Sequence, residues 1–346
     1  MSAQATRPSQ AEQVTTAAPQ SRDASLTVDS RHGRAQTRAS FHAGITLHRP
    51  HLDANAAKAQ RHELNLTARA SLRHTMNAHE GLIVHTPDIT DASMKTAHAL
   101  LADNQQIMTQ LVRQMQGILQ HQRATTVAHG KPFGQTFDAT RTVNQDFRYF
   151  TKKRPPNEAP TLAIAVRLDQ SASMVDDDRI AHEQAAILTL TAFCRALDIP
   201  LAISGDTADI SAREATSIYT YKTFADDYDT ALLRLADLKA FNNNRDGSAL
   251  RILLDQLADR PEQTKLLLNL SDGQPRALPN YTGALAKADL QDVVKLATSR
   301  GCTLLSAALG DDAATLKEIY GADHFLDFTD LHKLPTNLVH TVMRFI

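Results

Sequence analysis

The stretch Leu162-Ala-Ile-Ala-Val-Arg-Leu-Asp169-Gln-Ser171-Ala-Ser173-Met174 decides the fold class of this chain. Its first part is a short, mostly apolar run, which is typical of a buried strand. The strand runs directly into Asp-x-Ser-x-Ser, so one carboxylate and two hydroxyls fall in the loop at its carboxyl end. Open α/β sheets bind their ligands at that edge. We therefore expect the chemistry of the chain to lie at Asp169, Ser171 and Ser173.

Short apolar runs alternate with longer helical patterns through the C-terminal half. This alternation predicts an α/β fold, a doubly wound and mainly parallel sheet with helices on both faces. The expected strands are 162–168, 201–204, 217–222, 265–270, 303–309 and 324–328. The expected helices are 179–197, 227–238, 248–259, 284–299, 313–320 and 335–345.

The polar loops of this half predict a divalent-cation site. Hard cations such as Mg²⁺, or Mn²⁺ in its place, prefer carboxylate, hydroxyl and water oxygens. Asp272 follows the strand 265–270, which we expect to neighbour the strand before Asp169, so the two carboxylates would face each other. Residues 242–248 open a helix at the same edge and supply either Asp246 or Ser248 as a third-loop ligand.

Other interpretations of the same residues are weaker. Asp169 and the serines could simply cap the following helix, and capping is compatible with metal binding. A phosphatase of the haloacid dehalogenase class needs a second Asp two positions after its nucleophile, where this chain has Ser171. Neither a G-x-G-x-x-G after the first strand nor a G-x-x-x-x-G-K-[ST] is present, so no nucleotide cradle is predicted. We expect no catalytic residues.

The N-terminal half divides into two expected regions ahead of the 158–346 domain. Residues 1–90 are polar and lack a sustained apolar period, which predicts a mostly disordered region. Residues 91–157 combine an amphipathic helix, up to about residue 122, with a linker rich in Gly and Pro. That helix either packs on its own domain or docks a partner.

Bulk properties exclude several classes. The formal net charge is -1 over 346 residues and the pI is near 7.0, so no global field attracts nucleic acid or an anionic membrane. The first residues lack the apolar core of a secretory signal, and no run is long enough for a membrane span. We expect a cytoplasmic protein with neither nucleic acid nor membrane as partner.

The quoted motifs together resemble the von Willebrand factor A (vWA) domain found at the C-terminus of the cobaltochelatase T subunit and of the nitric oxide reductase activation protein D. The resemblance covers about residues 130–346. Its segments are Phe133–Asp138, Asp169–Met174, Asn244–Leu250, Leu270–Pro275, Tyr281–Gly283, Ile319–Gly321 and Leu334–Pro335.

The resemblance implies a metal-ion-dependent adhesion site (MIDAS). In it Asp169, Ser171 and Ser173 bind the ion, Asp272 supports it, and an acidic side chain of a target protein completes the shell. It also implies an adaptor role beside a separate AAA+ ATPase of the MoxR type in maturation or activation of that target. The alternative is a subunit of a cobaltochelatase-like metal-insertion complex. The chain departs from the usual pattern because the third-loop Thr is not evident.

Overall fold

The computed structural model describes the chain from residue 47 onward, with gaps. The described residues are 47–48, 50, 54–78, 81–123, 126–134, 136–144, 147–154, 161–273, 275–310 and 313–345. The expected disorder of residues 1–46 and the expected domain boundary at residue 158 lie outside them, as do Gln135 and Gln274 of the family motifs.

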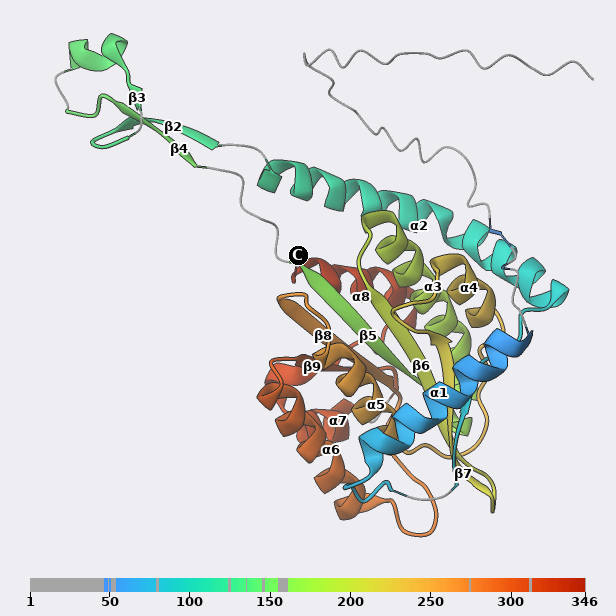
Figure 1. Ribbon diagram of the computed structural model, residues 1–346. Coiled ribbons are helices and arrows are strands. Elements are labelled where there is room, and N and C mark those ends of the chain that lie inside the picture. Colours follow the sequence, from blue (N-terminus) through green and yellow to red (C-terminus); the bar gives the residue numbers. More distant parts are fainter. Residues whose placement is uncertain are drawn as a thin grey trace, which may run out of the picture. The chain divides into compact units, whose positions relative to one another are not determined.

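A seven-stranded sheet forms the centre of the fold, in the order β1-β7-β6-β5-β8-β9-β10 (Figure 1). Every neighbouring pair is parallel except β6 with β7, whose short connection permits only an antiparallel pair. The expected doubly wound, mainly parallel sheet is confirmed, and β5 and β8 are neighbours as expected. The bounds are β1 (Leu82–His85), β5 (Leu162–Asp169), β6 (Leu201–Ser211), β7 (Glu214–Lys222), β8 (Thr264–Ser271), β9 (Thr303–Ala308) and β10 (Phe325–Asp327).

Helices cover both faces of this sheet (Figure 1). One face packs against α2 (Asp91–Arg123), α3 (Arg179–Leu197), α4 (Tyr228–Leu235) and α8 (Leu334–Met343). The other packs against α5 (Asp246–Ala258), α6 (Gly283–Ser299) and α7 (Ala313–Tyr320). Short 3₁₀ segments complete the domain: η2 (Ala172–Asp178), η3 (Ala322–His324) and η4 (Leu331–Lys333).

The period-two alternation of β5 sorts its side chains between the two layers. Ile164, Val166 and Leu168 belong to the core beneath α3 and α8. Ala163 and Ala165 belong to the core beneath α5 and α6. The next two side chains of that second set are Arg167 and Asp169, so the strand itself directs both of them toward the start of α5.

The structure corrects the expectation for residues 54–90. Helix α1 (Ala54–Leu72) and strand β1 occupy part of the region expected to be mostly disordered, and β1 pairs with β7 at the sheet edge. Both elements have little apolar surface, since α1 buries only Ala68 and Leu72 and β1 has four residues. Too few positions therefore carry a periodic pattern for sequence analysis to detect.

Helix α2 is confirmed, and it packs on its own domain. Ala97, Leu101 and Met108 lie in the main hydrophobic core. The helix begins with a reciprocal cap in which the Thr90 and Ser93 side chains each accept a hydrogen bond from the other residue's backbone N–H, at 3.1 and 2.7 Å. The first part of this apolar face is therefore covered by the domain itself, as the first of the two alternatives expects.

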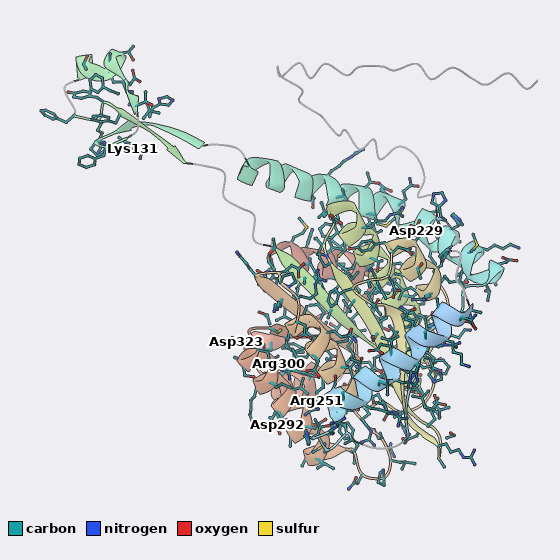
Figure 2. All side chains as sticks on the ribbon, viewed as in Figure 1. Lys131, Asp229, Arg251, Asp292, Arg300 and Asp323 are labelled. Carbon is teal, nitrogen blue, oxygen red and sulfur yellow. The ribbon has the colours of Figure 1, made fainter. Side chains whose placement is uncertain are left out.

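The expected linker between α2 and β5 contains a small antiparallel sheet. Its strands are β2 (Thr126–Lys131), β3 (Thr136–Phe137) and β4 (Phe150–Arg154), in the order β2-β4-β3, with η1 (Ala139–Asn144) between β3 and β4. Figure 2 shows its side chains, with Lys131 labelled. Phe133 and Phe147 are strongly exposed, so this unit has no packed core of its own among the described residues.

Candidate metal centre

The loop after β5 brings three predicted residues together. The Asp169 carboxylate accepts a hydrogen bond at Oδ1 from the Ser171 backbone N–H at 2.9 Å. The Ser171 and Ser173 hydroxyls lie 3.1 Å apart. Ser171 occupies the N-cap position of η2 but makes no capping bond with its side chain. Its hydroxyl is therefore directed to Ser173 rather than used as a helix cap.

Asp272 reaches the same place from β8, as predicted. It is 8% exposed and lies within hydrogen-bond reach of the Ser173 hydroxyl and, at 3.4 Å, of the Arg179 guanidinium. Burial and the nearby charge of Asp169 raise the pKa of Asp272 above its usual value, although Ser173 and Arg179 oppose that rise. A bound cation would relieve this crowding of negative charge.

The third loop contributes Asn244, which sequence analysis did not single out as a site residue. Its side-chain Nδ2 donates to Asp169 Oδ2 at 3.2 Å and to Asp246 Oδ1 at 2.9 Å. Its Oδ1 accepts the backbone N–H of Arg276 at 2.9 Å, which holds the amide in this orientation. Asn244 therefore presents donors, not a ligand oxygen, to the site.

The two predicted third-loop candidates are both completely buried at the start of α5. Asp246 Oδ2 and Ser248 Oγ have no hydrogen-bond partner within the described part of the chain. Buried polar atoms without partners are uncommon. Both atoms are thus compatible with a ligand role.

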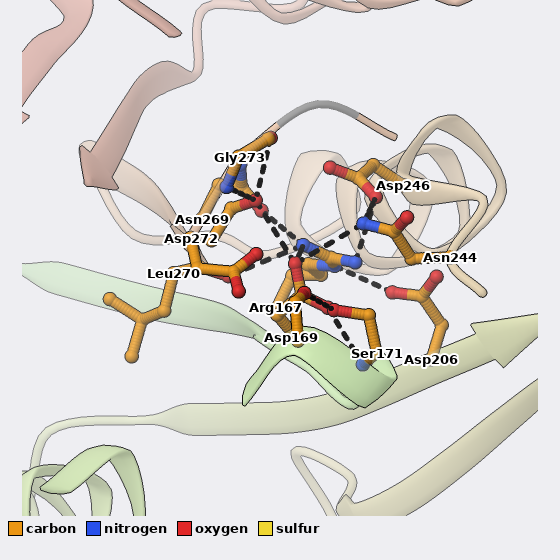
Figure 3. Close-up of polar contacts among 12 residues, drawn as sticks. Arg167, Asp169, Ser171, Asp206, Asn244, Asp246, Asn269, Leu270, Asp272 and Gly273 are labelled. Atoms are coloured by element: carbon orange, nitrogen blue, oxygen red, sulfur yellow. Dashed lines mark hydrogen bonds and ion pairs between the residues drawn. The ribbon is translucent and has the colours of Figure 1, made fainter. Parts of the chain in front are cut away.

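Arg167 is the main residue that sequence analysis missed (Figure 3). Its guanidinium is completely buried beneath the loop and pairs with Asp206 at 2.5 Å, Asp246 at 2.9 Å and Asp169 at 3.4 Å. Burial alone would lower the pKa of Arg167, but the three carboxylates raise it well above its ordinary value. The sequence did contain one indication of this role: Arg167 is charged and lies two positions before Asp169, so both side chains point to the same face of the strand.

Glu183 on α3 is a second missed residue. It is completely buried, and its Oε1 accepts the backbone N–H of Asp169 at 3.1 Å. Burial, with a further contribution from the charge of Asp169, raises the pKa of Glu183 well above the usual carboxyl value. Glu183 therefore supports the end of β5 through its hydrogen bond to the Asp169 backbone.

The donor set decides which ions fit. Among the described residues, no group of three or more His, Cys, Asp or Glu is arranged to hold a metal. A site here depends instead on two serine hydroxyls together with Asp169 and Asp272, which suits Mg²⁺ or Mn²⁺ and not thiolate- or imidazole-preferring metals. Cys194 and Cys302 are free and buried elsewhere in the domain.

Two further features bear on function. The acidic run Asp176–Asp178 is exposed, and Asp177 pairs with Arg179 at 3.2 Å. None of the helices in the described residues is both long and apolar enough to span a bilayer.

Comparison with known proteins gives relatives but no family model, since none matches the chain. Protein NorD of Brucella suis is 29% identical over 192 residues, which cover 52% of this chain and 29% of that protein. The uncharacterized protein YojO of Bacillus subtilis is 24% identical over 219 residues. This match covers 57% of this chain and 33% of that protein. The chain therefore spans only about a third of the length of these curated relatives.

Solved structures with a similar fold include two von Willebrand factor domains. The vWF domain of the type V pili tip protein Mfa5 from Porphyromonas gingivalis is 12% identical, with a TM-score of 0.43, and the match covers 54% of this chain and 96% of that one. A von Willebrand factor type A protein from Catenulispora acidiphila is 14% identical, with a TM-score of 0.38, over 56% of this chain and 44% of that one.

Proposed function

We propose that the chain, which has a doubly wound sheet and is 29% identical to protein NorD over about half of its length, is a non-catalytic, metal-ion-dependent protein-binding module of the von Willebrand factor A type. The observation that carries this proposal is the convergence of Asp169, Ser171 and Ser173 from one loop with Asp272 from the neighbouring strand. These four side chains offer carboxylate and hydroxyl oxygens, the ligands that hard divalent cations prefer.

The exposure of these groups suits a site that a partner completes. Asp169, Ser171 and Asp272 are buried, whereas Ser173 is open to solvent. The four side chains would hold Mg²⁺ at the surface of the domain. The ion would supply a positive charge able to bind a carboxylate from another protein. The chain's own part is to hold these oxygens in place through the backbone of the Asp169 loop and through Ser271, which donates to Asp169 at 3.0 Å.

The family resemblance supports our choice of partner. We propose a MoxR-type AAA+ ATPase as the motor and a target protein that offers an acidic side chain to the ion. Neither nucleotide motif occurs within these 346 residues, and we propose that a separate polypeptide supplies the ATPase, as the family resemblance implies.

A pull-down of the tagged full chain from extract of its own cells tests this proposal. Wild type, Asp169→Ala and a control, Asp292→Ala, are compared in Mg²⁺ and in EDTA by mass spectrometry. Asp292 (Figure 2) is exposed on α6, where it pairs with Lys295, so its loss leaves the candidate site intact. Circular dichroism establishes that each variant is folded.

The expected result is an AAA+ ATPase recovered with wild type and Asp292→Ala in Mg²⁺, and lost with EDTA or Asp169→Ala. Recovery of a large chelatase subunit under the same conditions would favour the metal-insertion complex instead. If the ATPase is recovered equally well with EDTA and with Asp169→Ala, the cation site takes no part in the interaction.

A further inference from the structure

We infer that Arg167 is a built-in counter-cation of the candidate metal centre, and that it withdraws Asp246 from the ligand set. The ion would then be held by Asp169, Ser171, Ser173 and Asp272, and the buried Ser248 hydroxyl would remain as the third-loop candidate. This inference rests on the proposed cation site and assigns its ligands and the origin of its affinity.

The guanidinium uses all three of its nitrogens in contacts that fix its position (Figure 3). Nε donates to Asp206 on β6 at 2.5 Å, and Nη2 donates to Asp246 on α5 at 2.9 Å. Nη1 donates to Asn269 Oδ1 and to the Leu270 carbonyl, both on β8 and both at 3.2 Å. Arg167 therefore joins three elements from a completely buried position and cannot swing aside to admit an ion.

Asp246 is engaged by this cation rather than by the loop that carries the serines. Its Oδ1 accepts from both Arg167 and Asn244, at 2.9 Å each. Its other oxygen, Oδ2, has no partner among the described residues and is the atom through which it would bind an ion. An ion there would share one buried carboxylate with a guanidinium, and two like charges in a low dielectric repel strongly.

The contacts of Asp169 divide its two oxygens in the same way. Oδ2 accepts from Ser271 at 3.0 Å and from Asn244 at 3.2 Å, with Arg167 at 3.4 Å. Within the described part of the chain, Oδ1 accepts a hydrogen bond only from the Ser171 N–H. Asp169 thus turns Oδ2 toward the guanidinium and Oδ1 toward the backbone of the loop that carries Ser171 and Ser173.

The arrangement sets the charge that an ion meets. Arg167 partly neutralises the inner carboxylates of Asp169, Asp206 and Asp246, and Arg179 lies 3.4 Å from Asp272. An ion at the serines therefore meets less negative charge than the number of nearby carboxylates suggests. Weak binding by the free protein, strengthened when a partner adds a carboxylate, is the consequence.

The test measures Mn²⁺ affinity of the purified full chain by calorimetric titration, together with the melting temperature in EDTA. Four variants are compared with wild type: Asp246→Asn, Asp272→Asn, Arg167→Met and, as a control for lost stability alone, Asp226→Asn. Asp226 pairs with Arg234 beside α4, outside the candidate site.

We expect Asp246→Asn and Asp226→Asn to bind Mn²⁺ within about threefold of wild type, while Asp272→Asn loses at least tenfold. Arg167→Met should gain at least tenfold, because three buried carboxylates then lack their counter-cation. Its melting temperature should fall in EDTA and recover with Mn²⁺, an effect that a purely structural role for Arg167 would not produce.

A loss of affinity in Asp246→Asn as large as that in Asp272→Asn would overturn the assignment of Asp246. If Arg167→Met does not fold with or without Mn²⁺, the comparison of the two asparagine variants decides alone. If wild type does not bind Mn²⁺, the result would count against the proposed function. In that case Arg167→Met decides the inference: a gain of Mn²⁺ binding in this variant would support it, and no gain would overturn it.

Discussion

The Ser173 hydroxyl lies 3.1 Å from the Ser171 hydroxyl, yet Ser173 is exposed and Ser171 is buried. The pair therefore extends from the buried part of the candidate site to the solvent. A residue in that position can contribute to ion binding without contributing to the core, which separates the two effects in an experiment.

We predict that Ser173→Ala weakens Mg²⁺ binding with little effect on folding. The variant removes the proposed hydroxyl ligand and the contact with Asp272, but exposes no apolar surface, so its free energy of unfolding in EDTA should change by less than about 0.5 kcal/mol. The Mg²⁺-induced rise in melting temperature should fall to less than half of the wild-type value. The melting temperature is measured without Mg²⁺ and at Mg²⁺ concentrations raised in 10-fold steps from about 0.1 to 10 mM.

Ser299→Ala is the matched control, since that exposed hydroxyl bonds the Leu296 carbonyl at the end of α6. It should retain the full Mg²⁺ response. An unchanged response in Ser173→Ala as well would show that the Ser173 hydroxyl is not a ligand.

A second prediction concerns α1, which contacts the domain through few residues. Leu72 is 1% exposed and packs in one cluster with Leu82 of β1 and Ile252 of α5. Leu72→Ala should lower the free energy of unfolding by about 2–5 kcal/mol, because it leaves a cavity between the helix and the sheet edge. Urea denaturation followed by circular dichroism measures this change.

Leu66 provides the comparison on the same helix, because it is 52% exposed. Leu66→Ala should change stability by no more than about 0.5 kcal/mol. Equal, small effects of both substitutions would mean that α1 does not pack on the domain as described.

These two regions show what the sequence could and could not predict. The elements with a strong apolar period were predicted closely: α3 begins at Arg179 and ends at Leu197, and α7 covers 313–320, both as expected. The adjacency of β5 and β8 and the meeting of Asp169 with Asp272 also followed, because topology places the carboxyl ends of neighbouring parallel strands together.

The parts that were missed depend on contacts between distant segments. Arg167 interrupts an apolar strand, and only its partners Asp206 and Asp246 explain why burial is tolerated there. Those partners lie 39 and 79 positions away in sequence. Similarly, β1 is a strand because β7 provides a free edge for it, a condition that four residues cannot reveal by themselves.

A last prediction concerns the pH dependence of stability at Asp226, where α1 meets the main sheet. Asp226 accepts hydrogen bonds from the Thr223 backbone and hydroxyl at 2.8 and 2.9 Å and from Gln60 of α1 at 3.1 Å, and Arg234 lies at 3.4 Å. Burial raises the pKa of Asp226, but these hydrogen bonds and the Arg234 charge outweigh it and lower the pKa below its ordinary value. The folded state therefore binds this proton less tightly than the unfolded state does.

The sign follows from linkage. The ionised carboxylate contributes stability above the unfolded-state pKa of about 3.9, and that contribution is lost as the pH falls through the lower folded-state pKa. Asp226→Asn should thus be less stable than wild type by about 1–3 kcal/mol at pH 7. The difference should shrink below about pH 4, as measured by urea denaturation from pH 7 down to pH 3.

Asp237→Asn, a surface variant whose carboxylate is half exposed beside Lys239, should show a small difference at every pH. If the Asp226→Asn deficit instead grew as the pH fell, the carboxylate would have to be favoured in its protonated form, contrary to the hydrogen bonds that surround it.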